Sequence, residues 1–426
     1  MSTMNNRQES GRSYVIIGDG IAGSSAAEIL AEETDSASIT ILSAESEPLY
    51  NRILIKEYAK GKLPRDVVEI HDQSWYDERG IDLRLDTRVQ TVETGEKTVV
   101  TADGERIAYD ELIVATGGTP RQLPVPNGSA DGVTTFWTVE DAARIREQAS
   151  EAETGAIVGG GLLGIDYAAV AAAQDVEAHY LIREDRWFAR AMSPAGAAIV
   201  HDALRERGVE PVFETTVEGF ETDPEGRVAA TVTEDGRTYD SDFVGVAIGT
   251  EPNTAFLEDT PVTLDGGVVV DSHLRTGVES VWAAGDVTRY YDERFSTHLS
   301  NGTWESAATQ GELAARNALA DDSGDPFETV PSYTVNHFPF PIASFGHPSL
   351  GDAYVERTYG EREWRRLAFR DGMLVGGVLI GDLAPLKPLK ELTASGARVQ
   401  HRAPALLAQS FDGLTVEQAP TPVSSD

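Results

Sequence analysis

Cysteine is absent from all 426 residues of the chain. Its absence excludes disulfides, a thiol nucleophile, an all-cysteine zinc site and an iron–sulfur cluster held by the chain itself. The eight histidines are scattered, with neither an HExxH motif nor paired ligand spacing. We therefore predict that the chain holds no metal and has no thiol of its own that could carry electrons.

Basic residues are scarce: 35 Lys and Arg stand against 70 Asp and Glu, for a formal net charge of −35. The acidic residues are spread along the chain, which indicates an acidic folded surface and argues against nucleic acid or anionic lipid as a partner. Lysine is nearly absent, and the few lysines are Lys56, Lys60, Lys62, Lys97, Lys387 and Lys390. Together with the acidity, this scarcity predicts adaptation to high salt, where the Debye length falls to about 3 Å at 1 M.

Long apolar runs are missing as well. No run approaches the ~18 residues of a membrane-spanning helix, and no charged-then-apolar leader opens the chain. We expect no membrane partner and a cytoplasmic location. Both ends, 1–12 and 412–426, are polar or rich in Pro and Ser, and we expect them to be mobile.

An internal repeat is present between these ends. "SYVIIGDGIAGSSAAEIL" at 13–30 is echoed by "TGAIVGGGLLGIDYAAVA" at 154–171. Each copy is a β-branched strand, a glycine turn and an Ala-rich helix, and a second strand follows at 38–42 or at 178–182, as in a βαβ unit. One such match is a weak signal, but two copies in the same context predict that the chain binds two dinucleotides.

The glycines have separate tasks in this motif. Gly18 permits the tight turn, Gly20 lets the backbone approach a pyrophosphate, and Gly23 lets the helix pack on the strand. The N–H groups at the start of the helix then face the phosphates. The second copy repeats the pattern with Gly159, Gly161 and Gly164.

An acidic residue is expected after the second strand of each unit to accept the ribose hydroxyls. In the first unit this is Glu45, with Glu47 as the alternative. In the second unit Glu184 suits an unphosphorylated ribose, whereas Arg183 and Arg186 suit a 2′-phosphate. Because both readings fall in one loop, the sequence leaves NADH and NADPH open.

Several further motifs stand in a characteristic order: "YNRILIK", "IVATGGTP", "AIGTEPNT", "VWAAGDV" and "NGTWESAATQG", then "ASFG" and "GGVLIGD". With both glycine motifs, they resemble the pyridine nucleotide-disulfide oxidoreductases. The resemblance is to the cysteine-free branch that includes rubredoxin and ferredoxin reductases and the flavin module of assimilatory nitrite reductases. It runs from about Tyr14 to Asp382.

The resemblance implies an α/β fold with two Rossmann-like domains and a small α+β C-terminal domain. The FAD domain would span 13–120 and 250–326, the NAD(P) domain 121–249, and the C-terminal domain 327–411. A helix beginning near Asn301 would point its positive end at the flavin. The further cofactor-binding residues that it implies are Ile21, Ala22, Arg52, Val89, Ala115, Thr116, Gly117, Leu163, Gly249, Gly285, Asp286 and Trp304.

The same resemblance implies a charged pair at the site of hydride transfer. Lys56 would lie near flavin N5, and Asp166 of the second glycine motif would hold its ammonium group. Two departures stand out: the family usually has Glu where this chain has Asp166, and Glu57 occupies the position where the common spacing places the lysine. Because an aspartate side chain is one methylene group shorter than a glutamate, contact between Asp166 and Lys56 depends on how close the two segments lie.

Without cysteine, electrons must leave from the flavin itself. The resemblance then implies an NAD(P)H-dependent reductase that supplies a ferredoxin or rubredoxin, with a homodimer left open. One alternative is an oxidase or quinone reductase, which a pocket closed by "HFPFPIASFG" at 337–346 would favour. Another is an NAD(P)H-responsive flavoprotein with a binding or scaffold role. We expect Trp364 and the 375–382 segment to serve core packing.

Overall fold

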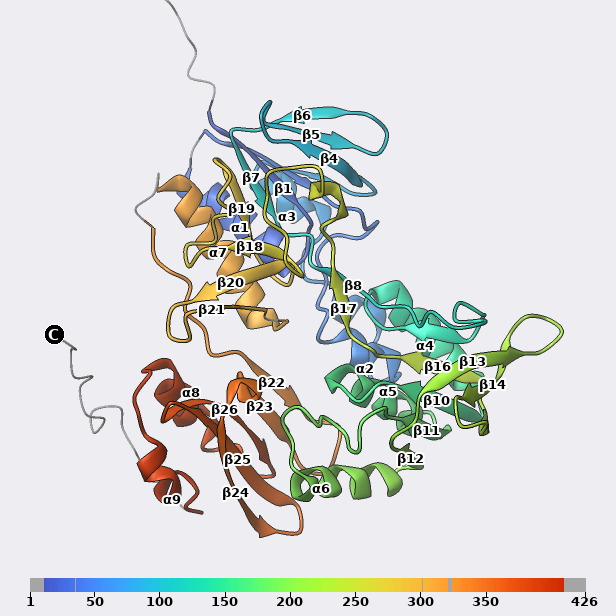
Figure 1. The fold of residues 1–426 in the computed structure, drawn as a ribbon. Helices are drawn as coiled ribbons and strands as arrows, with labels where there is room; N and C mark the ends of the chain where they lie inside the picture. The colour runs from blue at the N-terminus through green and yellow to red at the C-terminus, as the bar shows by residue number, and fades with distance from the viewer. Residues whose placement is uncertain (1–10, 35, 301, 321–323, 410–426) are drawn as a thin grey trace, which may run out of the picture. The chain divides into compact units, whose positions relative to one another are not determined.

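The computed structural model describes residues 11–34, 36–300, 302–320 and 324–409. The expected mobile ends therefore lie outside the described residues, except for Gly11 and Arg12. The chain divides into two compact units (Figure 1). The first contains the described parts of Met1–Asn51, Asp66–Thr119 and Glu251–Glu328, and the second those of Arg52–Arg65, Pro120–Thr250 and Thr329–Asp426.

The first unit is built on a five-stranded parallel sheet of order β19-β7-β1-β2-β3. Its strands are β1 (Ser13–Ile17), β2 (Ser38–Leu42), β3 (Ile81–Arg84), β7 (Glu111–Val114) and β19 (Val281–Ala283). The apolar side chains of β1 are buried, as is typical of a parallel strand that is covered on both faces. Helix α1 (Ile21–Glu33) connects β1 to β2 and packs closely on α7 (Trp304–Leu319), where a Cβ on Gly311 would come within 2.0 Å of the Ala22 carbonyl oxygen.

Smaller elements complete this unit. Two three-stranded sheets have the orders β4-β5-β6 and β18-β20-β21. They contain β4 (Val89–Glu93), β5 (Thr98–Thr101), β6 (Arg106–Ala108), β18 (Val268–Val270), β20 (Thr288–Asp292) and β21 (Thr297–Leu299). The short helices are α3 (Gln73–Glu78) and the 3₁₀ turn Ala255–Leu257, and a further 3₁₀ turn, Arg65–Val68, crosses the division between the units.

The second unit repeats the same architecture with a parallel sheet of order β12-β11-β10-β16-β9. The strands are β9 (Val133–Thr135), β10 (Thr154–Val158), β11 (Glu177–Leu181), β12 (Val209–Val212) and β16 (Phe243–Val246). The helices are α2 (Ile55–Ala59), α4 (Val139–Glu151), α5 (Leu162–Ala173) and α6 (Pro194–Arg205). An antiparallel sheet adds β13 (Val217–Thr222), β14 (Val228–Thr233) and β15 (Thr238–Asp240).

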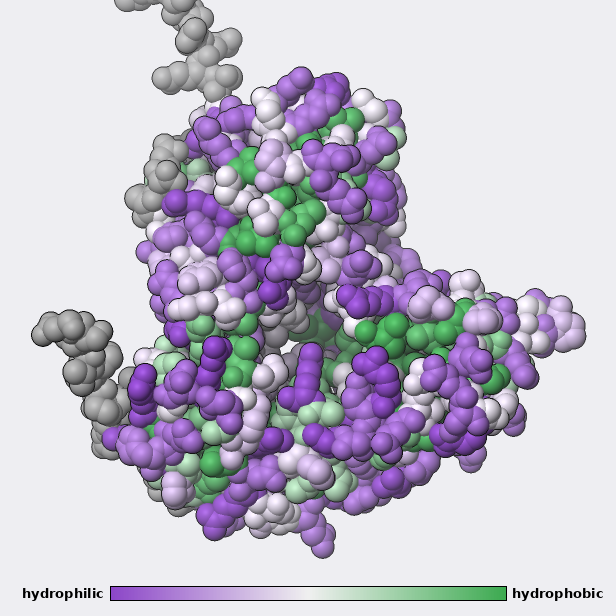
Figure 2. Space-filling model, viewed as in Figure 1, coloured by the Kyte–Doolittle hydropathy of each residue, from purple (hydrophilic) through white to green (hydrophobic). Residues whose placement is uncertain are grey.

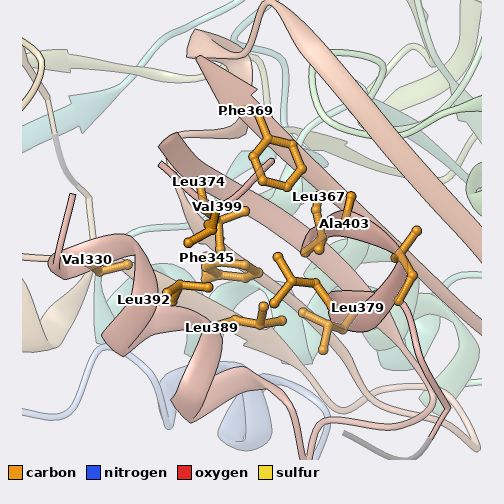
Figure 3. Close-up of a cluster of buried hydrophobic side chains, with 12 residues drawn as sticks. Val330, Phe345, Leu367, Phe369, Leu374, Leu379, Leu389, Leu392, Val399 and Ala403 are labelled. Carbon is orange, nitrogen blue, oxygen red and sulfur yellow. The ribbon is translucent and has the colours of Figure 1, made fainter. Parts of the chain in front are cut away.

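Residues from Thr329 onward form an antiparallel sheet of order β22-β23-β26-β25-β24. Its elements are β22 (Ser332–Val335), β23 (Ile342–Gly346), β24 (Ala353–Gly360), β25 (Glu363–Arg370), β26 (Met373–Ile380), α8 (Leu386–Ala394), α9 (Ala403–Leu406) and the 3₁₀ turns Pro348–Leu350 and Gln400–Arg402. Figure 3 shows Phe345, Leu379 and Leu389 in the apolar cluster between this sheet and its helices.

Contacts within the second unit join this sheet to α6. Trp364 on β25 is 1% exposed, as expected of a core residue, and a Cβ on Gly196 of α6 would come within 2.7 Å of its ring. Arg362 donates to both carboxylate oxygens of Glu206, at 2.7 and 2.8 Å. Glycine at position 196 therefore allows the helix to pack directly on the indole.

The structure confirms the predicted fold class: two parallel, Rossmann-like sheets and a small α+β C-terminal part. The chain passes from one unit to the other within two short paired strands, β8 (Gly118–Pro120) and β17 (Thr250–Pro252). The face drawn in Figure 2 is mostly hydrophilic, in keeping with the acidic composition. Within the described residues no helix is both long and apolar enough to cross a bilayer.

Candidate functional site

The first glycine turn, residues 18–23, connects β1 to α1. Gly18 has a φ of +106°, and its N–H donates to the Leu42 carbonyl oxygen at 2.8 Å. A Cβ at Gly18 would lie 2.4 Å from the Ala115 oxygen, and one at Gly23 would lie 1.9 Å from the Gly18 oxygen. Only glycine fits at these two positions. The positive φ and the close contact exclude a side chain at Gly18, and the close contact alone excludes one at Gly23.

Gly20 differs from its neighbours because a Cβ there would meet no protein atom within 4 Å. It is the N-cap residue of α1, and in the described part of the chain no side chain caps this helix end. Ile21 is half-buried and Ala22 is buried at the start of the helix. An open, uncapped helix start beside a glycine fits a pyrophosphate group.

The second glycine turn, residues 159–164, has the same geometry. Gly159 has a φ of +122°, donates to the Leu181 oxygen at 3.1 Å, and would place a Cβ 2.2 Å from the Ala247 oxygen. A Cβ at Gly164 would meet the Tyr180 hydroxyl at 2.0 Å, whereas one at Gly161 would meet nothing within 4 Å. The predicted repeat is therefore also a repeat of local structure.

Matching segments lie beside the two turns. Ala115 follows β7 and donates to the Ile17 oxygen at 2.8 Å, and Ala247 follows β16 and donates to the Val158 oxygen at 2.8 Å. Two residues on, Gly117 and Gly249 have φ values of +58° and +103°. The hydroxyl of Thr116 donates to the Asn253 backbone oxygen at 2.8 Å, and the Asn253 amide donates to the Thr116 oxygen at 2.9 Å.

Glu45 lies just beyond β2 and is half-buried. Tyr50 donates its hydroxyl to Glu45 Oε2 at 2.7 Å, and the Glu45 backbone N–H donates to the Ser43 hydroxyl at 3.2 Å. These contacts hold the carboxylate after the strand, where a ribose acid is expected. Glu47, the alternative, is also half-buried.

The corresponding loop of the second unit follows β11 and contains Glu184 and the two arginines Arg183 and Arg186. Glu184 lies close to the second glycine turn, since a Cβ at Gly160 would be 3.2 Å from Glu184 Oε2. Arg186 chelates Asp185 at 2.6 and 2.7 Å and donates to the Met192 carbonyl oxygen at 2.9 Å. Arg183 is exposed and donates to Glu184 Oε1 at 3.2 Å.

The region around Asp286 is buttressed by α7. Gly285 has a φ of +82°, and its N–H donates to Gln310 Oε1 at 2.7 Å. The expected helix start near Asn301 lies outside the described residues, and the helix begins at Trp304, after the N-cap residue Thr303. Asp286 is half-buried, as is Trp304.

Of the three other predicted residues, two lie outside the glycine turns and one, Leu163, lies within the second. Val89 is buried at the start of β4, and Leu163 is half-buried in the first turn of α5. Arg52 donates to the Trp137 carbonyl oxygen at 2.9 Å. These positions remain predictions for cofactor contact.

The shorter aspartate does reach Lys56, because Lys56 Nζ lies 3.4 Å from Asp166 Oδ1. Asp166 is 4% exposed, near the start of α5. Its other partners are Tyr333, which donates to Oδ2 at 3.0 Å, and His337, whose Nε2 lies 2.6 Å from Oδ1. Lys60 Nζ in turn contacts His337 Nδ1 at 3.1 Å.

Lys60 also forms an ion pair with Glu57 Oε1 at 2.5 Å. We call these six side chains the buried charged cluster: Lys56, Glu57, Lys60, Asp166, Tyr333 and His337. The sequence-based prediction missed four of them, namely Glu57, Lys60, Tyr333 and His337. Tyr333 lies on β22, and His337 follows the end of that strand, so no local sequence pattern connects them to Asp166.

The electrostatics of the cluster keep Asp166 charged. Burial alone would raise the pKa of Asp166, but the hydrogen bond from His337 and the charge of Lys56 outweigh burial and hold the pKa below its ordinary value. Burial raises the pKa of Tyr333 far above its ordinary value, and the neighbouring Asp166 raises it further. The phenol therefore stays protonated and donates to the carboxylate.

The fold and these sites define a class: a protein with two dinucleotide-binding βαβ units and a buried lysine–carboxylate pair. No group of His, Asp or Glu in the described residues could hold a metal ion. Residues 12–311 match the pyridine nucleotide-disulphide oxidoreductase family, and the chain belongs to it. It is an oxidoreductase that uses FAD and NAD(P)H, and with no cysteine it has no redox-active disulfide of its own.

Relatives support this placement. The ferredoxin reductase subunit of 5,5'-dehydrodivanillate O-demethylase from Sphingobium sp. is 30% identical over 389 residues, covering 90% of this chain and 94% of the relative. Nitrite reductase [NAD(P)H] from Bacillus subtilis is 27% identical over 87% of this chain, which spans only 46% of that protein. The crystal structure of the covalent putidaredoxin reductase–putidaredoxin complex shares the fold, with a TM-score of 0.89, 23% identity and coverage of 95% and 97% of the two chains.

Proposed function

We propose that the chain passes reducing equivalents from NAD(P)H to an external one-electron carrier of the ferredoxin or rubredoxin type. The observation that carries the proposal is the complete absence of cysteine in a member of this family, which leaves no protein thiol as the next acceptor. FAD accepts two electrons as hydride and releases them singly. Relatives named as reductases of such carriers cover most of the chain.

We assign phosphate binding to the two glycine turns, FAD at 18–23 and NAD(P)H at 159–164. Glu45, held by Tyr50, would accept hydrogen bonds from the FAD ribose, and Asp286 from the ribityl chain. We assign Lys56 and Asp166 to the flavin ring, where the ammonium would stabilise the negative charge that hydride transfer brings.

We infer a preference for NADH over NADPH. Glu184 lies close to the second glycine turn, where its carboxylate would accept ribose hydroxyls and repel a 2′-phosphate. Of the two arginines that would suit a phosphate, Arg186 is engaged by Asp185 and a backbone carbonyl, and Arg183 pairs with Glu184 itself. Glu184→Ala should reduce the NADH-over-NADPH ratio of kcat/KM by about tenfold, the equivalent of about 1.4 kcal/mol.

The matched control is Glu177→Ala, which removes an exposed carboxylate at the opposite end of β11 and should leave the ratio unchanged. An unchanged ratio in Glu184→Ala would refute the assignment of Glu184.

The main test is anaerobic stopped-flow mixing of the purified protein with NADH or NADPH in molar KCl, followed by addition of oxidised ferredoxin or rubredoxin. We expect the visible flavin absorbance to bleach with the nucleotide and to recover with a carrier. Bleaching that no carrier reverses, but that oxygen or a quinone does reverse, would replace the proposal with the oxidase or quinone reductase alternative. If the purified protein contained no flavin, the cofactor assignments would be refuted.

A further inference from the structure

The buried charged cluster extends well beyond the Lys56–Asp166 pair. From Asp166, one unbroken series of short contacts leads through His337 and Lys60 to Glu57, with distances of 2.6, 3.1 and 2.5 Å. All of these groups belong to the second unit, on or just after α2, on α5 and just beyond β22. A lysine–carboxylate pair that served only as a fixed charge would not require this extension.

Burial changes along the series. The side chains of Asp166, His337 and Lys60 are 5%, 5% and 2% exposed, whereas that of Glu57 is 28% exposed. Lys62, 62% exposed, lies 4.0 Å from Glu57 Oε2. The series therefore connects a buried carboxylate to the protein surface.

A surface cavity of about 540 Å³ adjoins Lys60, the member of the series next to Glu57. Its lining is largely polar, and a space of this size beside polar groups admits water. The residues that line it are Lys60, Gly61, Ala143, Arg146, Glu147, Ser150, Ala173 and Gln174.

Hydrogen-bond chemistry assigns the protons along the series. A protonated Lys60 can only donate, so His337 Nδ1 must accept from it, and the ring proton then sits on Nε2 and is donated to Asp166. With Nδ1 accepting from Lys60, the ring carries its single proton on Nε2 and has one donor and one acceptor in line.

A double proton transfer is open to this arrangement. Lys60 gives a proton to Nδ1 of His337 while Nε2 gives its proton to Asp166, which leaves a neutral amine, a neutral imidazole and a neutral carboxylic acid. Burial lowers the pKa of Lys60, against the opposing effect of Glu57, so the neutral amine is made more accessible. Lys60 then regains a proton from solvent through Glu57.

We propose that His337 and Lys60 are positioning residues that control the charge of Asp166 by this double transfer. The proposal rests on the proposed function, in which hydride from NAD(P)H would bring one negative charge to the flavin ring beside Lys56. When Lys56 turns to that charge, Asp166 would be left as a buried, unpaired carboxylate, and the transfer neutralises it. One proton enters from solvent per hydride and leaves by the reverse path when the two electrons depart, so atoms and charge balance.

Other titratable groups act on the protonation of His337 and Asp166. They lie on or just after α2, on β22 and on β11, and they are Lys56, Glu57, Lys60, Tyr333 and Tyr180.

The variant that tests the proposal is His337→Gln. A glutamine amide can donate to Asp166 and accept from Lys60, so both hydrogen bonds remain possible, but it cannot pass a proton between them. Lys60→Gln interrupts the same path at its next member. His401→Gln, at an exposed position, is the matched control, and circular dichroism establishes that each variant is folded.

The measurement is proton uptake on reduction of the flavin-loaded protein by photoreduction in weakly buffered solution with a pH indicator, so that neither NAD(P)H nor a carrier is involved. We expect wild type and His401→Gln to take up about one more proton per two electrons than His337→Gln and Lys60→Gln. In ¹⁵N NMR of wild type, the ring proton of His337 should move from Nε2 to Nδ1 on reduction.

Equal proton uptake in all four proteins, or a His337 ring that keeps its proton on Nε2, would overturn this proposal and leave the proposed function standing. A protein that binds no flavin would overturn both, and this would be visible from its absorbance before any reduction. Recovery of flavin colour by a carrier tests the proposed function alone.

Discussion

The buried side chain of His201 makes the free energy of unfolding depend on pH, and the structure predicts both the sign and the size of this dependence. It lies on α6, is 9% exposed, and its Nε2 accepts the Trp187 backbone N–H at 3.2 Å, so the ring must be neutral. Burial, helped by the charge of the nearby Arg205, lowers the pKa of His201 from 6.5 to about 4. Trp187 in turn donates its indole N–H to the Gly161 oxygen at 3.1 Å, which links this histidine to the second glycine turn.

The sign follows from proton linkage. Between pH 6.5 and about 4 the unfolded chain binds a proton that the folded chain does not bind, so the free energy of unfolding falls as the pH is lowered through this window. At about 1.36 kcal/mol per pH unit the full effect would be ~3.4 kcal/mol, and we expect about 2 kcal/mol because solvent screens part of the field. Above pH 6.5 the contribution is constant.

The assay is urea unfolding at constant KCl, at about pH 7.5 and about pH 4.5, for wild type and His201→Gln. Glutamine can accept the Trp187 N–H but does not titrate, so the variant should lose about 2 kcal/mol less stability on acidification than wild type. His401→Gln, which changes an exposed histidine, should behave as wild type. The same pH dependence in wild type and His201→Gln would refute the argument, since the carboxylates titrate equally in both.

Further predictions concern the glycines and the surface charge. Gly20→Ala should fold with wild-type stability, because its Cβ meets only open space, but it should copurify with less flavin. Gly18→Ala should lose both stability and flavin. Flavin absorbance and thermal unfolding distinguish the two cases. Gly196→Ala should destabilise by about 1–2 kcal/mol in urea, because overpacking of about 2–3 kcal/mol against Trp364 exceeds the helix-propensity gain of about 1 kcal/mol; a more stable variant would contradict the packing. Raising KCl from about 0.1 to about 1 M should raise the melting temperature, since the Debye length falls from about 10 to about 3 Å and the charge of −35 is screened; an unchanged melting temperature would count against adaptation to salt.

The sequence by itself determined the features whose causes are local. A strand, a glycine turn and a helix are encoded within about 20 residues, so Gly18 and Gly159 predicted both glycine turns, and their positive φ values follow from the lack of a side chain. The absence of cysteine excluded the thiol-dependent subclasses without any structure. Spacing alone predicted Glu45 and Glu184 as the acids that accept the ribose hydroxyls, and this role stays a prediction.

Only the tertiary structure decided which residues complete the sites. Asp166 and His337 are 171 residues apart, and no spacing rule connects them. Their contact depends on the packing of α5 against the segment that follows β22, which is set by side-chain complementarity summed over the fold. The structure also decided that the short side chain of Asp166 reaches Lys56, and that Arg186 is bound by its own loop. Sequence can name the chemistry that a residue offers, but the partners of a buried charge depend on which distant segments the core brings together.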